Sequence, residues 1–241
     1  MNIKKLCAFA AILFLTGITT VKAQNGDDII QKHIDAVGGS DNWGKVNTMK
    51  LSGAMNVQGM DISMTQTVVN DKGMRMDISA MGINGYTIIT PTEGWIYMPF
   101  QGMDKVTPLP ADELQSSKEK MDVKNIQLVD KSKIAKCEYM GNDTINNAGC
   151  YKVMVTDKQG NSQIAFFDAT NYYLVRTVNK IKMQNEEQEL AVNFSNFQKL
   201  PEGITVPMTW GTEQGDINFK SIEINKPYSD SLFKPDVEVK K

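Results

Sequence analysis

Residues 49–78 read MKLSGAMNVQGMDISMTQTVVNDKGMRMDI, and apolar residues occupy every second position through most of this stretch. Alternation with a period of two is typical of a β-strand that presents one side to apolar surroundings. Gly59 and the 70–73 segment interrupt the alternation with residues suited to turns. The stretch therefore predicts three consecutive strands, at 49–57, 60–68 and 74–78, that share one apolar face.

Methionine dominates this shared face. Its expected members are Met49, Leu51, Met55, Val57, Met60, Ile62, Met64, Val68, Met74, Met76 and Ile78. Strand cores usually favour stiff side chains such as Val, Ile and Phe, whereas flexible methionine suits surfaces that accept varied apolar guests. Two interpretations stay open: methionine fills gaps in an ordinary core, or it forms the adaptable wall of a cavity.

A dense aromatic run follows the three strands. Residues 94–100 read GWIYMPF, which makes Trp95 the best ligand platform among the three tryptophans of the chain. We therefore expect Trp95 and Tyr97 to complete a ligand-binding wall. Its other expected members are Met49, Leu51, Met55, Met60, Ile62, Met64, Met74, Met76 and Ile78.

The first 23 residues are typical of a removable export signal. Lys4 and Lys5 precede an apolar stretch at 6–18, and residues 21–23 form a small-x-small cleavage site. The apolar stretch is too short for a membrane span. We therefore expect cleavage after Ala23, a periplasmic protein that is not an integral membrane protein, and a single domain over residues 24–241.

The charge of the exported chain narrows its partners. Removal of Lys4, Lys5 and Lys22 leaves 23 basic and 28 acidic residues, which is a net charge of −5. Because nucleic acids and anionic surfaces attract basic proteins, this balance argues against nucleic acid as a partner.

The remaining pattern is a helix followed by many short strands. Apolar residues on one face at 29–37 predict a helix that Asp27 or Asp28 caps and that Gly38 and Gly39 end. A polar segment at 111–121 predicts a short surface helix or lid. Further strands are expected at 86–90, 93–98, 134–141, 150–156, 162–168, 172–184, 187–198, 204–209 and 216–224. This spacing is typical of antiparallel β-structure, as a sandwich, a barrel, or one long twisted sheet curled around a helix.

The sequence offers no pattern typical of catalysis. His33 is the one histidine, which argues against a zinc site, and its place on the apolar helix face favours a structural role. The Ser-x-x-Lys string at 117–120 lacks the motifs that accompany it in acyl enzymes. Carboxylates at 112–113 and 186–189 are typical of solvated positions. We therefore expect no enzyme activity, no metal and no cofactor.

Two cysteines, Cys137 and Cys150, follow the export signal. An oxidising compartment permits a disulfide between them, and the register of their hairpin decides it. With Asn146 and Asn147 as a two-residue turn, Cys150 faces Asp143 and the cysteines lie roughly 20 Å apart at about 3.3 Å per residue. A wider loop around 143–144 would bring them face to face.

Four segments resemble periplasmic lipoprotein carriers of the LolA-like family. Residues 92–100, TEGWIYMPF, are similar to the turn and strand that carry a W-x-Y-x-P-F type pattern in that family. Residues 166–176, FFDATNYYLVR, look like its strand-turn-strand pattern, and SNF at 195–197 leading to GITVP at 203–207 also fits. The tail INKPYSDSLF at 224–233 is similar to the ending of many members.

The resemblance implies both a fold and a function. The implied fold is mainly β with some α: a strongly curved antiparallel sheet, or incomplete β-barrel, with the N-terminal helix and a short mid-chain helix on its concave side. The implied function is a periplasmic carrier that holds an acyl chain of a lipid or lipoprotein in an apolar cavity without covalent chemistry. The alternative is an envelope sensor or accessory module that uses the same fold against a protein partner.

One segment departs from the family pattern. The carriers place an arginine before a proline in the turn ahead of the third strand, where it helps to hold a lid closed. This chain has Asn-Asp-Lys-Gly at 70–73, and the nearby Arg75 is expected on the strand face opposite to Met74 and Met76.

Overall fold

The computed structural model describes residues 25–183 and 186–236, so the expected export signal lies outside the described residues. In this part of the chain thirteen strands form one sheet. The strands are β1 (Thr48–Val57), β2 (Met60–Val69), β3 (Gly73–Ala80), β4 (Ile83–Ile89), β5 (Gly94–Tyr97), β6 (Thr107–Pro108), β7 (Ile134–Ile145), β8 (Ala148–Asp157), β9 (Ser162–Asp168), β10 (Leu174–Met183), β11 (Glu186–Lys199), β12 (Thr205–Thr212) and β13 (Gly215–Ile224). The helices are α1 (Gly26–Ala36), α2 (Ser40–Gly44), α3 (Ala111–Ser117) and α4 (Val123–Ile126), with 3-10 turns η1 (Pro99–Gln101), η2 (Lys118–Met121), η3 (Lys131–Lys133) and η4 (Asp230–Phe233).

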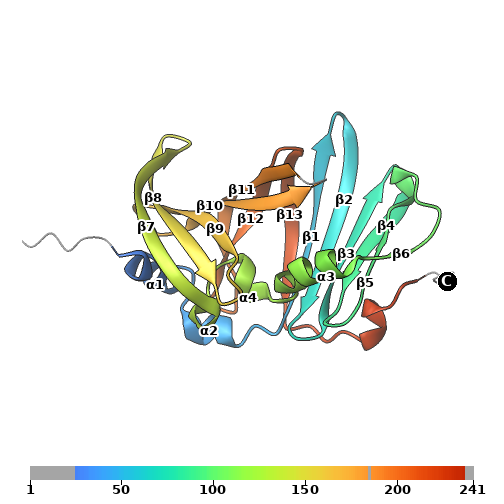
Figure 1. Cartoon of the computed structure of the whole chain (residues 1–241), viewed down its shortest axis with the longest axis horizontal. Helices are drawn as coiled ribbons and strands as arrows, with labels where there is room; N and C mark the ends of the chain where they lie inside the picture. Colours follow the sequence, from blue (N-terminus) through green and yellow to red (C-terminus); the bar gives the residue numbers. More distant parts are fainter. Residues whose placement is uncertain (1–24, 184–185, 237–241) are drawn as a thin grey trace, which may run out of the picture.

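The sheet consists of two antiparallel meanders joined at one strand pair. Its order is β6-β5-β4-β3-β2-β1-β13-β12-β11-β10-β9-β8-β7, so β1 pairs with β13, and β6 and β7 are the two edges. Figure 1 shows the two meanders as the sides of a curved sheet, with α3 and α4 between them. The expected fold, an antiparallel sheet curved into an incomplete barrel with an N-terminal helix, is confirmed.

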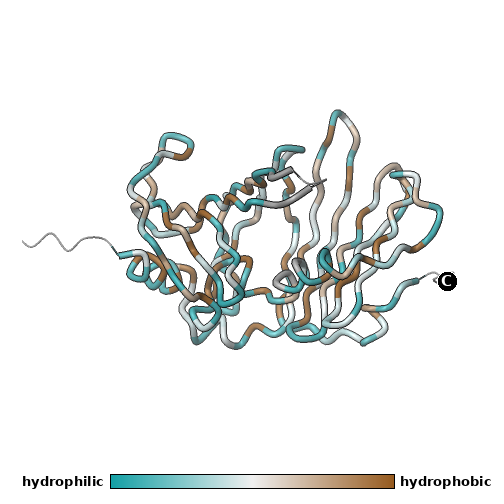
Figure 2. Tube along the Cα trace, in the orientation of Figure 1, coloured by the Kyte–Doolittle hydropathy of each residue, from teal (hydrophilic) through white to brown (hydrophobic). Residues whose placement is uncertain are grey.

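Alternation along the strands explains why these segments join the sheet. Figure 2 shows hydrophobic and hydrophilic positions following one another along the strands. The strands expected at 49–57, 60–68 and 74–78 occur as β1, β2 and β3. The β1–β2 turn uses Gln58 and Gly59 at φ 52° and 84°, and two consecutive positive φ angles are typical of a tight hairpin turn that suits twisted strands.

The N-cap of helix α1 lies two or three residues before its expected positions, Asp27 and Asp28. Asn25 is the N-cap, and its side chain accepts a hydrogen bond from Asp27 N at 3.2 Å. Asp27 and Asp28 instead lie in the first turn, where negative charge favours the helix dipole. The helix ends before Gly38, whose φ is 119°. A Cβ atom at Gly38 would stand 2.4 Å from the carbonyl oxygen of Gly203, so this position requires glycine.

The main hydrophobic core lies between the concave side of the sheet and the helices. It includes Ile29, Ile30, Ile34 and Val37 of α1, Trp43 of α2, and Val153, Val155, Ala165, Phe167 and Leu174 of the β8–β10 strands. Trp43 is held by a hydrogen bond from its Nε1 to the carbonyl oxygen of Val37, at 3.0 Å. Helix α1 therefore packs mainly against the second meander, which begins with β7 and β8.

The segment expected as a short surface helix at 111–121 is longer and more deeply inserted than its polar sequence indicates. After α3 the chain continues through η2 and α4. Met121, Val123, Leu128 and Val129 are all buried and belong to the main core. The mid-chain segment therefore closes part of the concave side.

Candidate functional site

The strand register places the expected methionines on one face, which is the concave face of the sheet. Met49 of β1 pairs with Val68 of β2, and Val68 pairs with Met74 of β3. Further along the same strands, Met55 pairs with Ile62. We call the following set the methionine face: Met49, Leu51, Met55, Met60, Ile62, Met64, Met74, Met76 and Ile78.

Burial divides the methionine face into two ends. Met49, Leu51, Met64 and Met74 are buried and belong to the main core, and they form its closed end. Met55, Ile62 and Ile78 are half-buried and Met60 is 37% exposed, and these four residues form its open end. Met76, the ninth member, is half-buried and, like Ile78, packs against the main core. Methionine is therefore core filler at one end of the face and partly accessible surface at the other.

The mid-chain segment covers the closed end. Met121, at the end of η2, is 9% exposed, and η2 contacts both β2 and β3. Val123 N donates to the Asn70 side-chain oxygen at 3.4 Å, which ties the segment to the β2–β3 turn. In Figure 1 this segment crosses between the two meanders. Access to the closed end therefore depends on the position of residues 111–129.

Aromatic rings continue the concave wall beyond β1. Phe219 of β13 pairs with Gly53 of β1, which lies between Leu51 and Met55 on the methionine face. The Trp210 ring stands 5.0 Å from Phe219 and 6.0 Å from Phe194, edge-on to both. The sequence showed no sign of this cluster, because three separate strands contribute one ring each.

Trp95 and Tyr97 do not belong to this wall, which corrects the expectation from the aromatic run. Trp95 pairs with Ile88, and Ile88 pairs with Arg75, so these side chains lie on the outer face of the sheet. There Trp95 and Tyr97 pack against a second, smaller hydrophobic cluster. Its members include Tyr86, Ile88, Val106 and Phe233.

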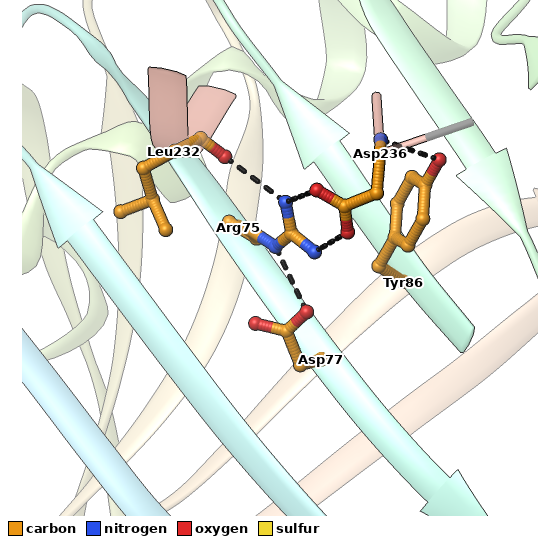
Figure 3. A network of polar contacts seen from close by, with 5 residues as sticks. All are labelled: Arg75, Asp77, Tyr86, Leu232 and Asp236. Atoms are coloured by element: carbon orange, nitrogen blue, oxygen red, sulfur yellow. Dashed lines mark hydrogen bonds and ion pairs between the residues drawn. The ribbon is translucent and has the colours of Figure 1, made fainter. Parts of the chain in front are cut away.

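Arg75 holds the C-terminal segment against this outer face, as Figure 3 shows. Its guanidinium makes paired contacts with the Asp236 carboxylate, and its Nη1 donates to the carbonyl oxygen of Leu232 at 3.3 Å. Its Nε donates to Asp77 Oδ1 at 2.8 Å, and its guanidinium lies 4.8 Å from the centre of the Tyr86 ring. Arg75 therefore serves the C-terminal segment and not a lid over the concave face.

His33 links three parts of the structure from the buried side of α1. Its Nδ1 lies 2.9 Å from the carbonyl oxygen of Tyr172, and its Nε2 lies 2.7 Å from that of Gln127. Burial lowers the pKa of His33, while these two carbonyls oppose the shift. Because a neutral imidazole has one N–H, it donates to one carbonyl at a time. His33 thus connects α1 to the β9–β10 turn and to the residue that follows α4.

The two cysteines are free thiols. Asn146 and Asn147 form the two-residue turn, with φ angles of 50° and 66°, and Cys150 pairs with Asp143. Cys137 pairs with Val155 and packs against the main core, so the hairpin register keeps the thiols apart and the possible disulfide does not form. Burial, together with Asp27, raises the pKa of Cys137 to about 11, which makes this thiol a weak nucleophile.

The described part of the chain holds no group of three or more His, Cys, Asp or Glu side chains able to bind a metal ion. None of the helices in residues 25–183 and 186–236 has the length and hydropathy needed to span a bilayer.

Two surface hollows on the described residues have volumes of about 400 and 410 Å3. Their lining comes from α1, the turns beside it and strands β7–β13, and neither is lined by the methionine face. The open end belongs to neither hollow, and we call its strip of Met55, Met60, Ile62 and Ile78 on the concave face the trough.

No family model and no curated protein matches this chain. Solved structures match it over most of its length. A DUF1329 family protein from Desulfovibrio piger has a TM-score of 0.54 at 13% identity, over 88% of this chain and 98% of its own. A LolA superfamily protein from Nitrosomonas europaea has a TM-score of 0.53 at 11% identity, over 89% and 99%. A putative outer membrane lipoprotein-sorting protein domain from Vibrio parahaemolyticus has a TM-score of 0.52 at 11% identity, over 86% and 95%.

Identities of 11–13% establish a shared fold without establishing a shared activity. Each of the three matches covers nearly the whole of the solved chain. This protein therefore shares the fold of these three solved structures.

Proposed function

We propose that this protein is a periplasmic carrier that holds the acyl chain of a lipid or of a lipidated protein in the open end of the methionine face. The observation that carries the proposal is the row of half-buried or exposed apolar side chains on the concave side of the sheet: Met55, Met60, Ile62 and Ile78. The fold shared with a putative lipoprotein-sorting domain supports the same class of ligand.

The methionine face as a whole is long enough for an extended chain. From Met49 to Met55, closed end included, it extends roughly 20 Å along β1 at about 3.3 Å per residue. Each buried methylene group contributes about 0.8 kcal/mol, so a chain of about 16 carbons supplies a gross gain near 12 kcal/mol. Part of this gain is lost to the ordering of the ligand and of the protein. Affinity in the micromolar range or tighter is therefore within reach of apolar contact alone.

Adaptability comes from the composition of the wall. Methionine side chains have three rotatable bonds and a polarizable sulfur, so they fit chains of different length and branching. The mid-chain segment at 111–129 covers the neighbouring closed end, where Met121 and Val123 are buried and Val123 N donates to the Asn70 side chain. A binding step of this kind needs no catalytic group.

A titration with a fluorescent fatty acid tests the proposal. The exported protein should give a saturable signal with a Kd at or below about 10 μM, which corresponds to roughly 7 kcal/mol. Unlabelled fatty acid should displace the probe. An absence of saturable binding would contradict the acyl-carrier proposal. Recovery of one envelope protein in a stoichiometric, lipid-free complex would instead support a sensor or accessory role.

A further inference from the structure

The two hollows share one lining residue, Phe197 of β11. One hollow extends from Phe197 toward the end of α1, and the other extends toward the tip of the β7–β8 hairpin. We call the combined feature the outer groove. Its principal lining residues are Asp35, Asp168, Tyr173, Asn193, Ser195, Phe197 and Asp216.

Strand alternation separates the outer groove from the trough. Asn193, Ser195 and Phe197 are alternate residues of β11, so they share one face. Phe194, between the first two, pairs with Trp210 on the concave wall. The trough lies on the concave face of β1–β3, whereas the outer groove lies on the opposite face of β7–β13, so a ligand in one does not occupy the other.

The middle of the outer groove is an aromatic platform. The rings of Tyr173 and Phe197 lie 4.6 Å apart at an angle of 42°, and both side chains are half-buried. Such a pair offers an apolar ring surface to a ligand that lies across it.

Polar groups without partners lie beside the platform. The side chains of Asn193, Ser195 and Asp216 make no hydrogen bond or ion pair within the described residues, although all three line the larger hollow. Gly211, the register partner of Asp216, leaves room for this carboxylate: a Cβ at Gly211 would stand 3.0 Å from Asp216 Oδ1. Asp168 also lines this hollow, and its Oδ1 accepts hydrogen bonds from the backbone of Thr170 and Asn171. Acceptors and amide donors are thus available to a ligand.

The charges of the lining restrict the ligand class. Two carboxylates and no lysine or arginine line the larger hollow, so an anionic ligand would be repelled. The smaller hollow has one acid and one base, Asp35 and Lys199, and therefore no strong charge of either sign. A metal ion lacks its ligand set, because no cluster of three or more coordinating side chains occurs in the described part of the chain. A purely apolar ligand would bury the carboxylates and amides without partners.

We propose that the outer groove is a second binding site, and that it takes a neutral saccharide of one to three rings. A sugar ring has an apolar face for the Tyr173–Phe197 platform and hydroxyl groups for the carboxylates and amides around it. Hydroxyls both donate and accept, so they match the unpartnered Asn193, Ser195 and Asp216 side chains. Volumes of about 400 Å3 each fall within the usual range for small-molecule sites.

An array of immobilised neutral and acidic oligosaccharides, probed with the exported protein, tests this site. We expect binding to neutral glycans, followed by measurement of Kd for the strongest one by calorimetry. Asp216→Asn keeps the size of an exposed side chain and should weaken that Kd at least tenfold. Asp104→Asn changes an exposed carboxylate outside the groove and should leave it unchanged. A saturating fatty acid should also leave it unchanged, because the trough lies on the other face.

Three results would overturn the proposal. They are an array without neutral-glycan binding, binding restricted to acidic glycans, and affinity that Asp216→Asn leaves unchanged. Phe197→Leu adds an independent readout, since it keeps apolar bulk in the groove but removes the ring. If a folded Phe197→Leu protein bound the glycan with unchanged affinity, the Tyr173–Phe197 pair would have no role in binding. None of these outcomes depends on acyl-chain binding.

Discussion

Replacing Ile62 with asparagine places an amide in the middle of the open end of the methionine face. Ile62 pairs with Met55 on one side and with Ala80 on the other, so its side chain stands between two strands of the wall. An acyl chain bound along the trough covers this position. In the complex, the introduced amide would lose its hydrogen bonds to water and would gain no hydrogen-bond partner from the hydrocarbon chain.

The magnitude follows from two effects. Burial of an unpaired amide costs about 1–3 kcal/mol, and the loss of apolar contact from a half-buried isoleucine removes about 1 kcal/mol more. The sum is about 2–4 kcal/mol, which corresponds to a Kd that is roughly 30- to 1,000-fold weaker. Because Ile62 is half-buried in the free protein, the folded state without ligand should lose much less stability.

The neighbouring residue provides the control. Ser63 follows Ile62 in β2, points to the outer face and is exposed, so Ser63→Asn introduces the same amide on the other side of the sheet. Titration with a fluorescent fatty acid should show weak binding for Ile62→Asn and unchanged binding for Ser63→Asn. The acyl-chain site would be refuted if the two variants bound equally well while both had wild-type melting temperatures.

Three further predictions concern parts of the structure that support the trough. Arg75→Met should lower the free energy of unfolding in urea by about 2 kcal/mol, because it breaks several hydrogen bonds to charged groups. Lys50→Met removes one partly exposed pair at 3.9 Å and should change that free energy by less than about 1 kcal/mol. Equal effects would contradict the role of Arg75 in holding the C-terminal segment. Because burial lowers the pKa of His33 in the folded state, stability should be full above its ordinary pKa of 6.5 and fall as the pH drops below it, by at most about 1.4 kcal/mol per pH unit. His33→Gln should flatten this slope in urea titrations between pH 6.5 and 5, and an unchanged slope would assign it to other groups. After denaturation of the exported protein without reductant, Cys137 and Cys150 should each react with an alkylating agent, and mass spectrometry should detect two added alkyl groups. A protein that takes up none would contain the disulfide.

The strand positions could be predicted because alternation is a local signal. The expected segments in both halves of the chain correspond to observed strands, and the face shared by Met49, Met64 and Met74 follows directly from parity within each strand. The Asn146-Asn147 turn also has a local signature, and it fixes the register that separates the cysteines.

The alternation of side chains does not continue across an irregular loop. This is why the sequence assigned Trp95 to the wrong face of the sheet. The 90–93 loop separates β4 from β5, and the pairing of Ile88 with Trp95 across it decides the face. Insertion of the mid-chain segment was also hidden, because Met121 and Val123 are two apolar residues in a polar stretch. The aromatic wall and the outer groove combine single residues from several strands, such as Phe197 of β11 and Asp216 of β13, and no sequence spacing encodes such a combination.

Native mass spectrometry of the exported protein, purified without detergent, tests the central claim most directly. The acyl-carrier account predicts a fraction of molecules that carries extra mass in the range of a lipid, and solvent extraction should release fatty acyl groups in the same amount. The Ile62→Asn protein should carry less of this mass than Ser63→Asn. A protein that is consistently free of lipid, and that also fails to bind added fatty acid, would contradict the account.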